Sequence, residues 1–176
     1  MDNYFKGKNI EEAFERDKIP IKDLPANFLW MQVKGGSKMK NLLSHAAGIM
    51  KDKTSTAVVW TGAGVAVAKA ISCAEIIKRQ FSIEHQVTKL GFKKVEEFWE
   101  PKIDGLETIV VKREIPVIHI LLSSEKIADT MQLGYQTPKD LKFWQPNQSK
   151  KSKPQQSYKS KKPYKHKNKS NDLNNT

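Results

Sequence analysis

Apolar and polar positions along this chain form a pattern that predicts two strand–helix pairs. Residues 28–33 have the apolar density and length of a strand, and from Met39 onward apolar residues recur every three or four positions, as on one face of a helix. The same order returns with a strand over 56–62 and a helix over 65–81. We expect the hydroxyl of Ser37 to cap the first helix.

A long hairpin is predicted to follow, with strands over 85–99 and 107–122. In the first of these strands the alternation changes phase, which predicts a bulge or a sharp twist. In the second, residues 115–122 are nearly all apolar, so the base of the hairpin should be buried and its tip should project. Pro116 cannot donate a hydrogen bond to a ladder, so it marks an edge or a bulge.

Composition divides the chain into four parts. Residues 1–26 are polar and predict a flexible leader with at most a helical turn or two. Residues 27–123 hold the predicted domain, and 124–146 form an extended segment that we expect to pack on it. Residues 147–176 are a lysine-rich tail whose composition predicts disorder, because it offers too little apolar surface to bury.

Charge and cysteine content limit the class of protein. The net charge is +12, and the last 32 residues contribute much of it, with nine lysines and one aspartate. The single cysteine, Cys73, excludes an internal disulfide, and its place on the apolar stripe of the second helix predicts a packed thiol. Nothing resembles a signal peptide, and no apolar run approaches the ~18 residues of a membrane span. We therefore expect a soluble intracellular protein with no membrane partner.

Little in the sequence points to catalysis, to a metal or to a cofactor. The second strand–helix turn lacks the third glycine of a dinucleotide fingerprint, because Val67 stands there, and no Walker lysine-serine pair follows. The four histidines lack the spacing of metal ligands. Glu96 and Glu97 are adjacent on a strand and point to opposite faces, so they cannot act together on one bond. We expect no catalytic residue, metal or cofactor.

Both predicted strand–helix turns are rich in glycine, and Lys34 and Lys38 flank the first. Backbone N–H groups at such a turn and at a helix N-terminus carry partial positive charge, which suits a phosphate. The alternative is that the glycines only permit tight turns, and the two interpretations are compatible.

Four segments in order carry a resemblance to a known family: residues 31–42, 60–64, 69–79 and 85–88. Together they resemble the Alba family, and within it the larger Alba-type subunits of eukaryotic nuclear ribonuclease P and ribonuclease MRP. The resemblance covers residues 27–123. It implies an α/β (α+β) two-layer sandwich with the order β-α-β-α-β-β, a four-stranded mixed sheet and a long C-terminal hairpin.

The resemblance also implies a function. The protein would be a noncatalytic RNA-binding subunit acting in tRNA 5′ maturation and rRNA processing, in the nucleus and nucleolus. Its partners would be the catalytic RNA component, other ribonucleoprotein subunits and a smaller Alba-type subunit with which it forms a heterodimer. The alternative is an Alba-type protein acting on messenger RNA or chromatin outside these enzymes.

Residue roles carry over from the same resemblance. The expected RNA-binding positions lie in the two turns: Lys34, Gly35, Gly36, Ser37, Lys38, Gly62, Gly64 and Lys69. The expected partner interface uses apolar residues of the second helix and the hairpin: Ala70, Ala74, Ile77, Val117 and Ile118.

The tail is a second candidate for RNA binding. Lys161, Lys162, Tyr164 and Lys165 combine cations with an aromatic ring, which adds base stacking to phosphate attraction. The same run resembles a nuclear-import signal, and a purely solubilising tail is the alternative.

The hairpin tip departs from the DNA-binding members of the family, because it is acidic where theirs is basic. Its carboxylates are Glu96, Glu97, Glu100, Asp104 and Glu107. We therefore predict that the tip contacts protein or solvent more than nucleic acid. Basic residues below the tip remain available for RNA: Lys93, Lys94, Lys112 and Arg113.

Overall fold

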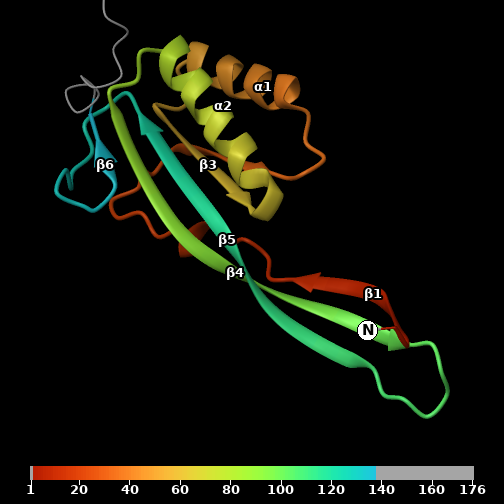
Figure 1. The fold of residues 1–176 in the computed structure, drawn as a ribbon. Coiled ribbons are helices and arrows are strands. Elements are labelled where there is room, and N and C mark those ends of the chain that lie inside the picture. Colours follow the sequence, from red (N-terminus) through yellow and green to blue (C-terminus); the bar gives the residue numbers. More distant parts are fainter. Residues whose placement is uncertain (1, 138–176) are drawn as a thin grey trace, which may run out of the picture. The chain divides into compact units, whose positions relative to one another are not determined.

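The computed structural model describes residues 2–137, which form one mixed sheet with two helices on one face (Figure 1). The sheet order is β1-β4-β5-β3-β2, and β6 also pairs with β4. The strands are β1 Tyr4–Glu11, β2 Phe28–Val33, β3 Ala57–Ala63, β4 His85–Pro101, β5 Ile109–Ser123 and β6 Tyr135–Gln136. The α-helices are α1 Met39–Lys51 and α2 Val67–Gln80, and short 3-10 turns span Arg16–Lys18 and Gly64–Ala66.

The predicted fold class is confirmed, with two more strands than expected. Strands β2 to β5 and the two helices follow the order β-α-β-α-β-β, with β2 and β3 parallel and the remaining pairs antiparallel. The added strands, β1 and β6, both pair with the outer edge of β4. An uncovered edge strand invites unwanted pairing, so these additions protect most of an otherwise open edge.

The main core lies between the helices and the sheet. Trp60 of β3 and Leu122 of β5 are fully buried against Ala70, Cys73 and Ile77 of α2, as the apolar stripe on that helix predicts. The small side chains of α2 allow a close approach to the sheet. Cys73 is packed in this core, as expected, and burial raises the pKa of its thiol.

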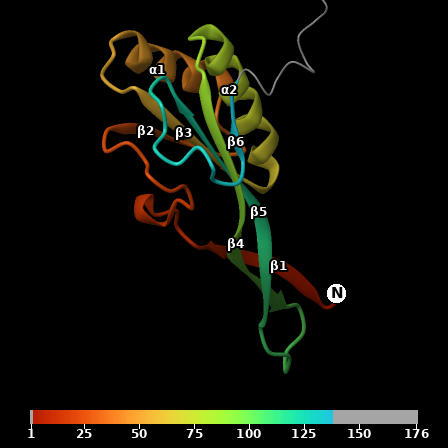
Figure 2. The ribbon, with the colours of Figure 1, turned by 90° about the vertical axis from the view of Figure 1, so that its left-hand side faces the viewer.

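A second core covers the other face of the sheet and corrects the expectation for residues 1–26. The sequence predicted a leader with at most a helical turn or two; residues 4–11 instead form β1, which lies along the outer half of β4 (Figure 2). Further along, Ile19 and Ile21 are buried against Val59 and Leu121 of the sheet. This segment therefore supplies part of the fold.

The hairpin of β4 and β5 projects from the helical layer, and its base is buried as predicted (Figure 1). Its register is unbroken from His85 opposite Ser123 to Trp99 opposite Ile109, so the predicted bulge is absent from this pair and the strands twist across each other instead. Pro116 immediately precedes Val117, the first β5 residue in chain order that pairs with β3, so it lies where that side of β5 is unpaired, at an edge as expected.

Residues 124–137 return across the sheet toward β4. Ile127 is buried in the second core, and the N–H of Thr88 donates to the carbonyl oxygen of Gly134 at 2.9 Å. Gly134 has φ +86°, and a Cβ on it would lie 2.1 Å from the carbonyl oxygen of Thr88, so only glycine fits. The rest of the predicted extended segment and the tail, with Lys161, Lys162, Tyr164 and Lys165, lie outside the described residues.

Candidate nucleic-acid interface

The two glycine-rich turns meet at one edge of the sheet. Parallel neighbours β2 and β3 pair with Val33 opposite Gly62, so the turns that follow them lie side by side. A Cβ built on Gly35 would lie 3.2 Å from a methyl carbon of Val65, which measures how closely the turns approach. A groove of about 720 Å³ runs along this edge and is lined by both turns.

The first turn is closed by two hydrogen bonds between Lys34 and Ser37. The N–H of Ser37 donates to the Lys34 carbonyl oxygen at 3.0 Å, and the Ser37 hydroxyl accepts from the N–H of Lys34 at 3.2 Å. The expectation that Ser37 caps α1 is therefore wrong, because its hydroxyl is used within the turn. Lys38 occupies the N-cap position and makes no side-chain cap.

Both helices begin at this edge. Neither α1 nor α2 has a side-chain cap or an acidic residue in its first turn. Carboxylates usually favour that position because they offset the positive end of the helix dipole. Lys34 and Lys38 are exposed beside the α1 terminus, so full and partial positive charges gather at one place.

Lys69 of α2, a predicted RNA contact, bonds to the backbone of the first turn. Its Nζ donates to the carbonyl oxygen of Gly35 at 2.5 Å and to that of Ser37 at 2.8 Å. These contacts bind the α2 side chain to the back of the first turn. Lys69 is therefore placed to position the turn, whereas Lys34 and Lys38 extend from it.

The four predicted glycines differ in their roles: some serve tight packing or turn geometry, and others are exposed to a ligand. Gly62 is buried, and a Cβ on it would lie 2.8 Å from the carbonyl oxygen of Ala66, so it permits close helix packing and offers no surface to RNA. Gly64 adopts φ +52°, which favours glycine for conformational reasons. Gly35 and Gly36 are exposed in the first turn and remain available to a ligand.

The N-terminal segment forms the opposite wall of the groove, which no pattern in the sequence predicted. Glu11 and Glu12 line that wall. Lys93 of β4, a predicted RNA contact, lies against the same wall and its Nζ is 2.7 Å from a carboxylate oxygen of Glu11. The groove therefore has a basic side at the glycine turns and an acidic side at the N-terminal segment.

The residues predicted for the partner interface are buried within this chain. Ala70, Ala74, Ile77, Val117 and Ile118 are each at most 5% exposed. All but Val117 belong to the core between the helices and the sheet, and Val117 lies on the opposite face, beside the N-terminal segment. In this chain by itself, these five side chains therefore offer little surface to a partner. Large exposed apolar side chains lie nearby on β4.

Leu90 and Phe92 are 76% and 74% exposed, on a stretch of β4 that the helices do not cover. In the described part of the chain, no strand pairs with the outer edge of β4 at these two residues. On either side of this stretch, backbone groups of β4 are already hydrogen-bonded. The Thr88 N–H donates to the Gly134 carbonyl oxygen, and the Lys94 carbonyl oxygen accepts from the Glu12 N–H. The phase change along β4 was the only sign of this patch in the sequence.

Part of the acidic charge near the hairpin tip is offset by ion pairs. Glu97 lies 3.0 Å from Lys6 of β1 and 3.1 Å from Arg113, and Glu96 lies 3.6 Å from Lys112. Lys112 and Arg113 are thus engaged with carboxylates on their own hairpin. That the hairpin tip contacts protein or solvent more than nucleic acid stays a prediction.

The described residues contain no cluster of three or more side chains suited to holding a metal ion. Within the same range, neither helix has the length and apolar character that crossing a bilayer requires.

These observations define a class: small α+β proteins with two glycine-rich turns at a positively charged sheet edge and a projecting hairpin. Residues 29–94 match the Alba family. The chain is 39% identical over 140 residues to the ribonuclease P protein subunit p25-like protein of Homo sapiens, covering 78% of this chain and 83% of that protein. It is also 37% identical over 155 residues to the ribonuclease P protein subunit p25 of Mus musculus, covering 78% and 77%. The chain belongs to the Alba family.

Two more distant similarities were found. The DNA/RNA-binding protein ALBA1 of Plasmodium falciparum is 33% identical over 113 residues, which are 64% of this chain and 45% of that protein. The solved structure of Alba from Thermoplasma volcanium aligns with 55% of this chain and 99% of its own, at a TM-score of 0.38 and 17% identity.

Proposed function

We propose that this chain is a noncatalytic RNA-binding subunit of nuclear ribonuclease P and ribonuclease MRP, acting in tRNA 5′ maturation and rRNA processing. The observation that carries the proposal is the sheet edge where Lys34 and Lys38 flank an uncapped helix N-terminus. The similarity to relatives named as ribonuclease P protein subunits supports the part of the proposal that places this chain in ribonuclease P. In this proposal the RNA component performs the chemistry, and the complex resides in the nucleus and nucleolus.

The glycine edge would hold the RNA through its backbone. Lysine side chains and free N–H groups bind phosphate oxygens, which fixes the position of the RNA and carries little sequence information. Each phosphate neutralised releases counterions, so affinity should fall steeply with salt.

The proposed protein partner is a smaller Alba-type subunit, held in a heterodimer. Leu90 and Phe92 support this part of the proposal, because they place exposed apolar side chains beside an open stretch of strand edge. Burying two such side chains on association would contribute about 1.5–3 kcal/mol each. We place the interface at these residues instead of at the buried positions named from the sequence.

Sequencing the RNA that co-purifies with the tagged full-length chain from nuclear extract tests the proposal. The RNA components of ribonuclease P and MRP should be enriched. Changing Lys34→Ala together with Lys38→Ala should reduce that enrichment strongly. The matched control is Lys51→Ala with Arg79→Ala, which removes the same charge from exposed positions at the other ends of the two helices.

The alternative is an Alba-type protein that acts on messenger RNA or chromatin, and the similarity to the Plasmodium DNA/RNA-binding protein favours it. The same experiment separates the two, since broad recovery of messenger RNA or DNA would support the alternative. If the double lysine variant retained all of its RNA, the glycine edge would not be the RNA site and both proposals would fail.

A further inference from the structure

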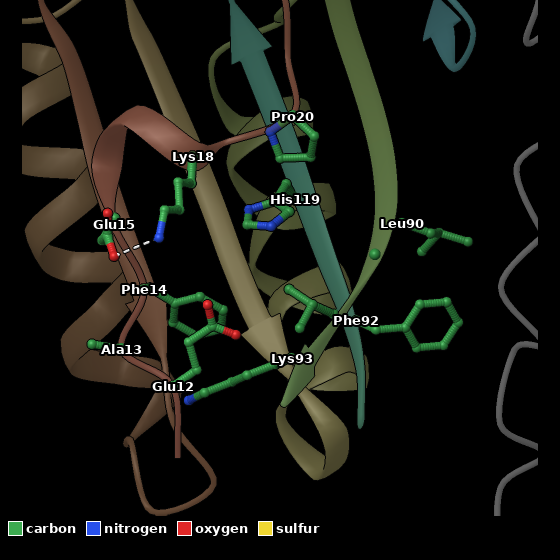
Figure 3. A pocket seen from close by; sticks show the side chains of 12 residues that line it. Glu12, Ala13, Phe14, Glu15, Lys18, Pro20, Leu90, Phe92, Lys93 and His119 are labelled. Carbon is green, nitrogen blue, oxygen red and sulfur yellow. Dashed lines mark hydrogen bonds and ion pairs between the residues drawn. The ribbon is translucent and has the colours of Figure 1, made fainter. Parts of the chain in front are cut away.

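A cavity of about 320 Å³ lies on the face of the sheet opposite the helices, under the N-terminal segment. On the side of the sheet it is lined by Gly91 of β4 and by Val117 and His119 of β5, which form its floor. Phe14 and Pro20 of the N-terminal segment line its walls, and Figure 3 shows them around His119. The side chains of Leu90 and Phe92 point away from it, as alternation along a strand requires.

Gly91 keeps the floor of the cavity open. A Cβ on Gly91 would meet no atom within 4 Å, and the backbone there does not have positive φ. Neither packing nor conformation therefore requires glycine at this position. What its missing side chain provides is space in front of Val117 and His119.

A chain of hydrogen bonds fixes the polar group that faces this space. The Trp30 Nε1–H donates to Thr61 Oγ1 at 2.9 Å, and Thr61 Oγ1 lies 3.0 Å from His119 Nδ1. We assign the Thr61 hydroxyl hydrogen to Nδ1, because the described residues offer it no other acceptor. With Nδ1 accepting, the ring proton is on Nε2. Burial lowers the pKa of His119, so the ring is neutral at neutral pH. His119 is 8% exposed, and among the described residues no side chain or backbone group hydrogen-bonds to its Nε2.

The charged groups around the cavity balance one another. Glu12 and Glu15 bring two negative charges, and Lys18 and Lys93 bring two positive ones. Lys18 is paired with Glu15 at 2.8 Å, and Lys93 lies over the ring of Phe14 at 4.5 Å from its centroid. A phosphate gains little in such surroundings. A neutral, planar group with both donors and acceptors on its edge suits them better.

The cavity also adjoins the groove at the glycine turns. Four residues line both spaces: Glu12, Ala13, Phe14 and Lys93. A volume of about 320 Å³ is at the lower end of the ~300–1,000 Å³ of small-molecule sites. This space suits one base better than a larger ligand.

We propose that this cavity receives a single unpaired nucleobase of the bound RNA, with His119 Nε2–H donating to an acceptor on the base edge and Phe14 forming an aromatic wall. The inference rests on the proposed RNA-binding function and adds a base-reading site to a backbone-binding one. Proteins that read RNA sequence generally do so on splayed-out bases of this kind.

The test begins with an RNA hairpin selected on the full-length chain from a library with a randomised eight-nucleotide loop. Each loop base is then removed in turn by an abasic substitution, and affinities are measured. At one loop position, base removal should weaken binding about tenfold, in line with the contribution of one held base. Removal at the other positions should cost less.

Three variants connect that position to the cavity. His119→Asn keeps an acceptor near the Nδ1 position for Thr61 but lacks the Nε2 donor, so it should lose about tenfold and become insensitive to the abasic change. His119→Gln, whose amide nitrogen lies near the Nε2 position, should retain most of the effect. Gly91→Val places a branched side chain in the cavity without altering charge and should act like His119→Asn. Thermal unfolding of each variant identifies any loss that comes from misfolding.

The outcomes distinguish this inference from the proposed function. If binding depends on Lys34 and Lys38 but the abasic profile is the same for wild type, His119→Asn and Gly91→Val, the base site is wrong and the RNA-binding edge stands. If no selected hairpin depends on Lys34 and Lys38, the proposed function fails and this inference fails with it.

Discussion

Replacing Lys69 with methionine should separate a residue that positions the RNA-binding turn from one that contacts phosphate. Methionine keeps most of the aliphatic stem and removes the ammonium that donates to the carbonyl oxygens of Gly35 and Ser37. A hydrogen bond to a charged group contributes ~1.5–3 kcal/mol, and solvent weakens the exposed one of this pair. Together they should hold the turn by about 2 kcal/mol.

The expected consequence is a loss of RNA affinity with an unchanged salt dependence. A turn released from α2 no longer presents Lys34 and its N–H groups in one arrangement, and we expect about a tenfold weaker complex, equivalent to about 1.4 kcal/mol. Lys34→Met removes a phosphate contact, so the slope of log affinity against log salt should fall by ~0.7–0.9. Lys69→Met should leave that slope as it is.

Fluorescence anisotropy with a labelled RNA hairpin, at four salt concentrations between roughly 50 and 200 mM, measures both quantities. Lys69→Arg is the matched control, because its guanidinium can still donate to two carbonyl oxygens, so affinity should largely recover. If Lys69→Met lowered the salt slope as much as Lys34→Met does, Lys69 would bind phosphate directly and the positioning role would be refuted.

Three further predictions concern stability and the tail. Gly62→Ala should lower the free energy of unfolding by ~1–3 kcal/mol in urea, because its Cβ would press on the Ala66 carbonyl oxygen; Gly36→Ala, which meets no atom, should not destabilise. The free energy of unfolding should fall as pH drops below the ordinary histidine pKa of 6.5, because burial lowers the pKa of His119 and the unfolded chain therefore binds the proton first. The slope of the free energy of unfolding against pH should reach up to ~1.4 kcal/mol per pH unit, and His119→Asn should flatten it. Deleting residues 149–170 should flatten the salt dependence of RNA binding by ~0.7–0.9 for each phosphate that the tail neutralises, and an unchanged slope would count against binding by the tail.

The central elements were predictable because their patterns are strong and local. The bounds of β2 are those predicted, and the helices and the hairpin follow the periodicities of buried faces. Strand β1 was missed because its burial pattern is mostly exposed, so it has no apolar face to reveal it. Ile19 and Ile21 were missed because two apolar residues on either side of a proline are too few to show the periodicity of a helix or a strand.

The site was predictable only in part, for a related reason. Glycines and lysines at two turns mark an anion-binding edge in the sequence itself, but the sequence does not say which way a side chain turns. Lys69 turns back onto carbonyl oxygens, and Ser37 bonds within its own turn. The cavity at His119 brings together Phe14 and β5, which are far apart in the chain, so no local pattern could indicate it.

The alternation along β4 connects the two proposed binding surfaces. Leu90 and Phe92 point away from the cavity, to the side where we place the protein partner, while Gly91 and Lys93 face the cavity and the groove. A shift of register by one residue would exchange the two faces, putting apolar side chains into the RNA cavity and a lysine into the partner interface. The pairing of β4 with β5 continues without a bulge through this stretch, and β1 and β6 close the outer edge on either side of it. Strand β1 therefore does more than cover an edge. It pairs with β4, and the chain that follows it supplies Phe14, which forms a wall of the cavity. Both proposed surfaces thus depend on the register of β4.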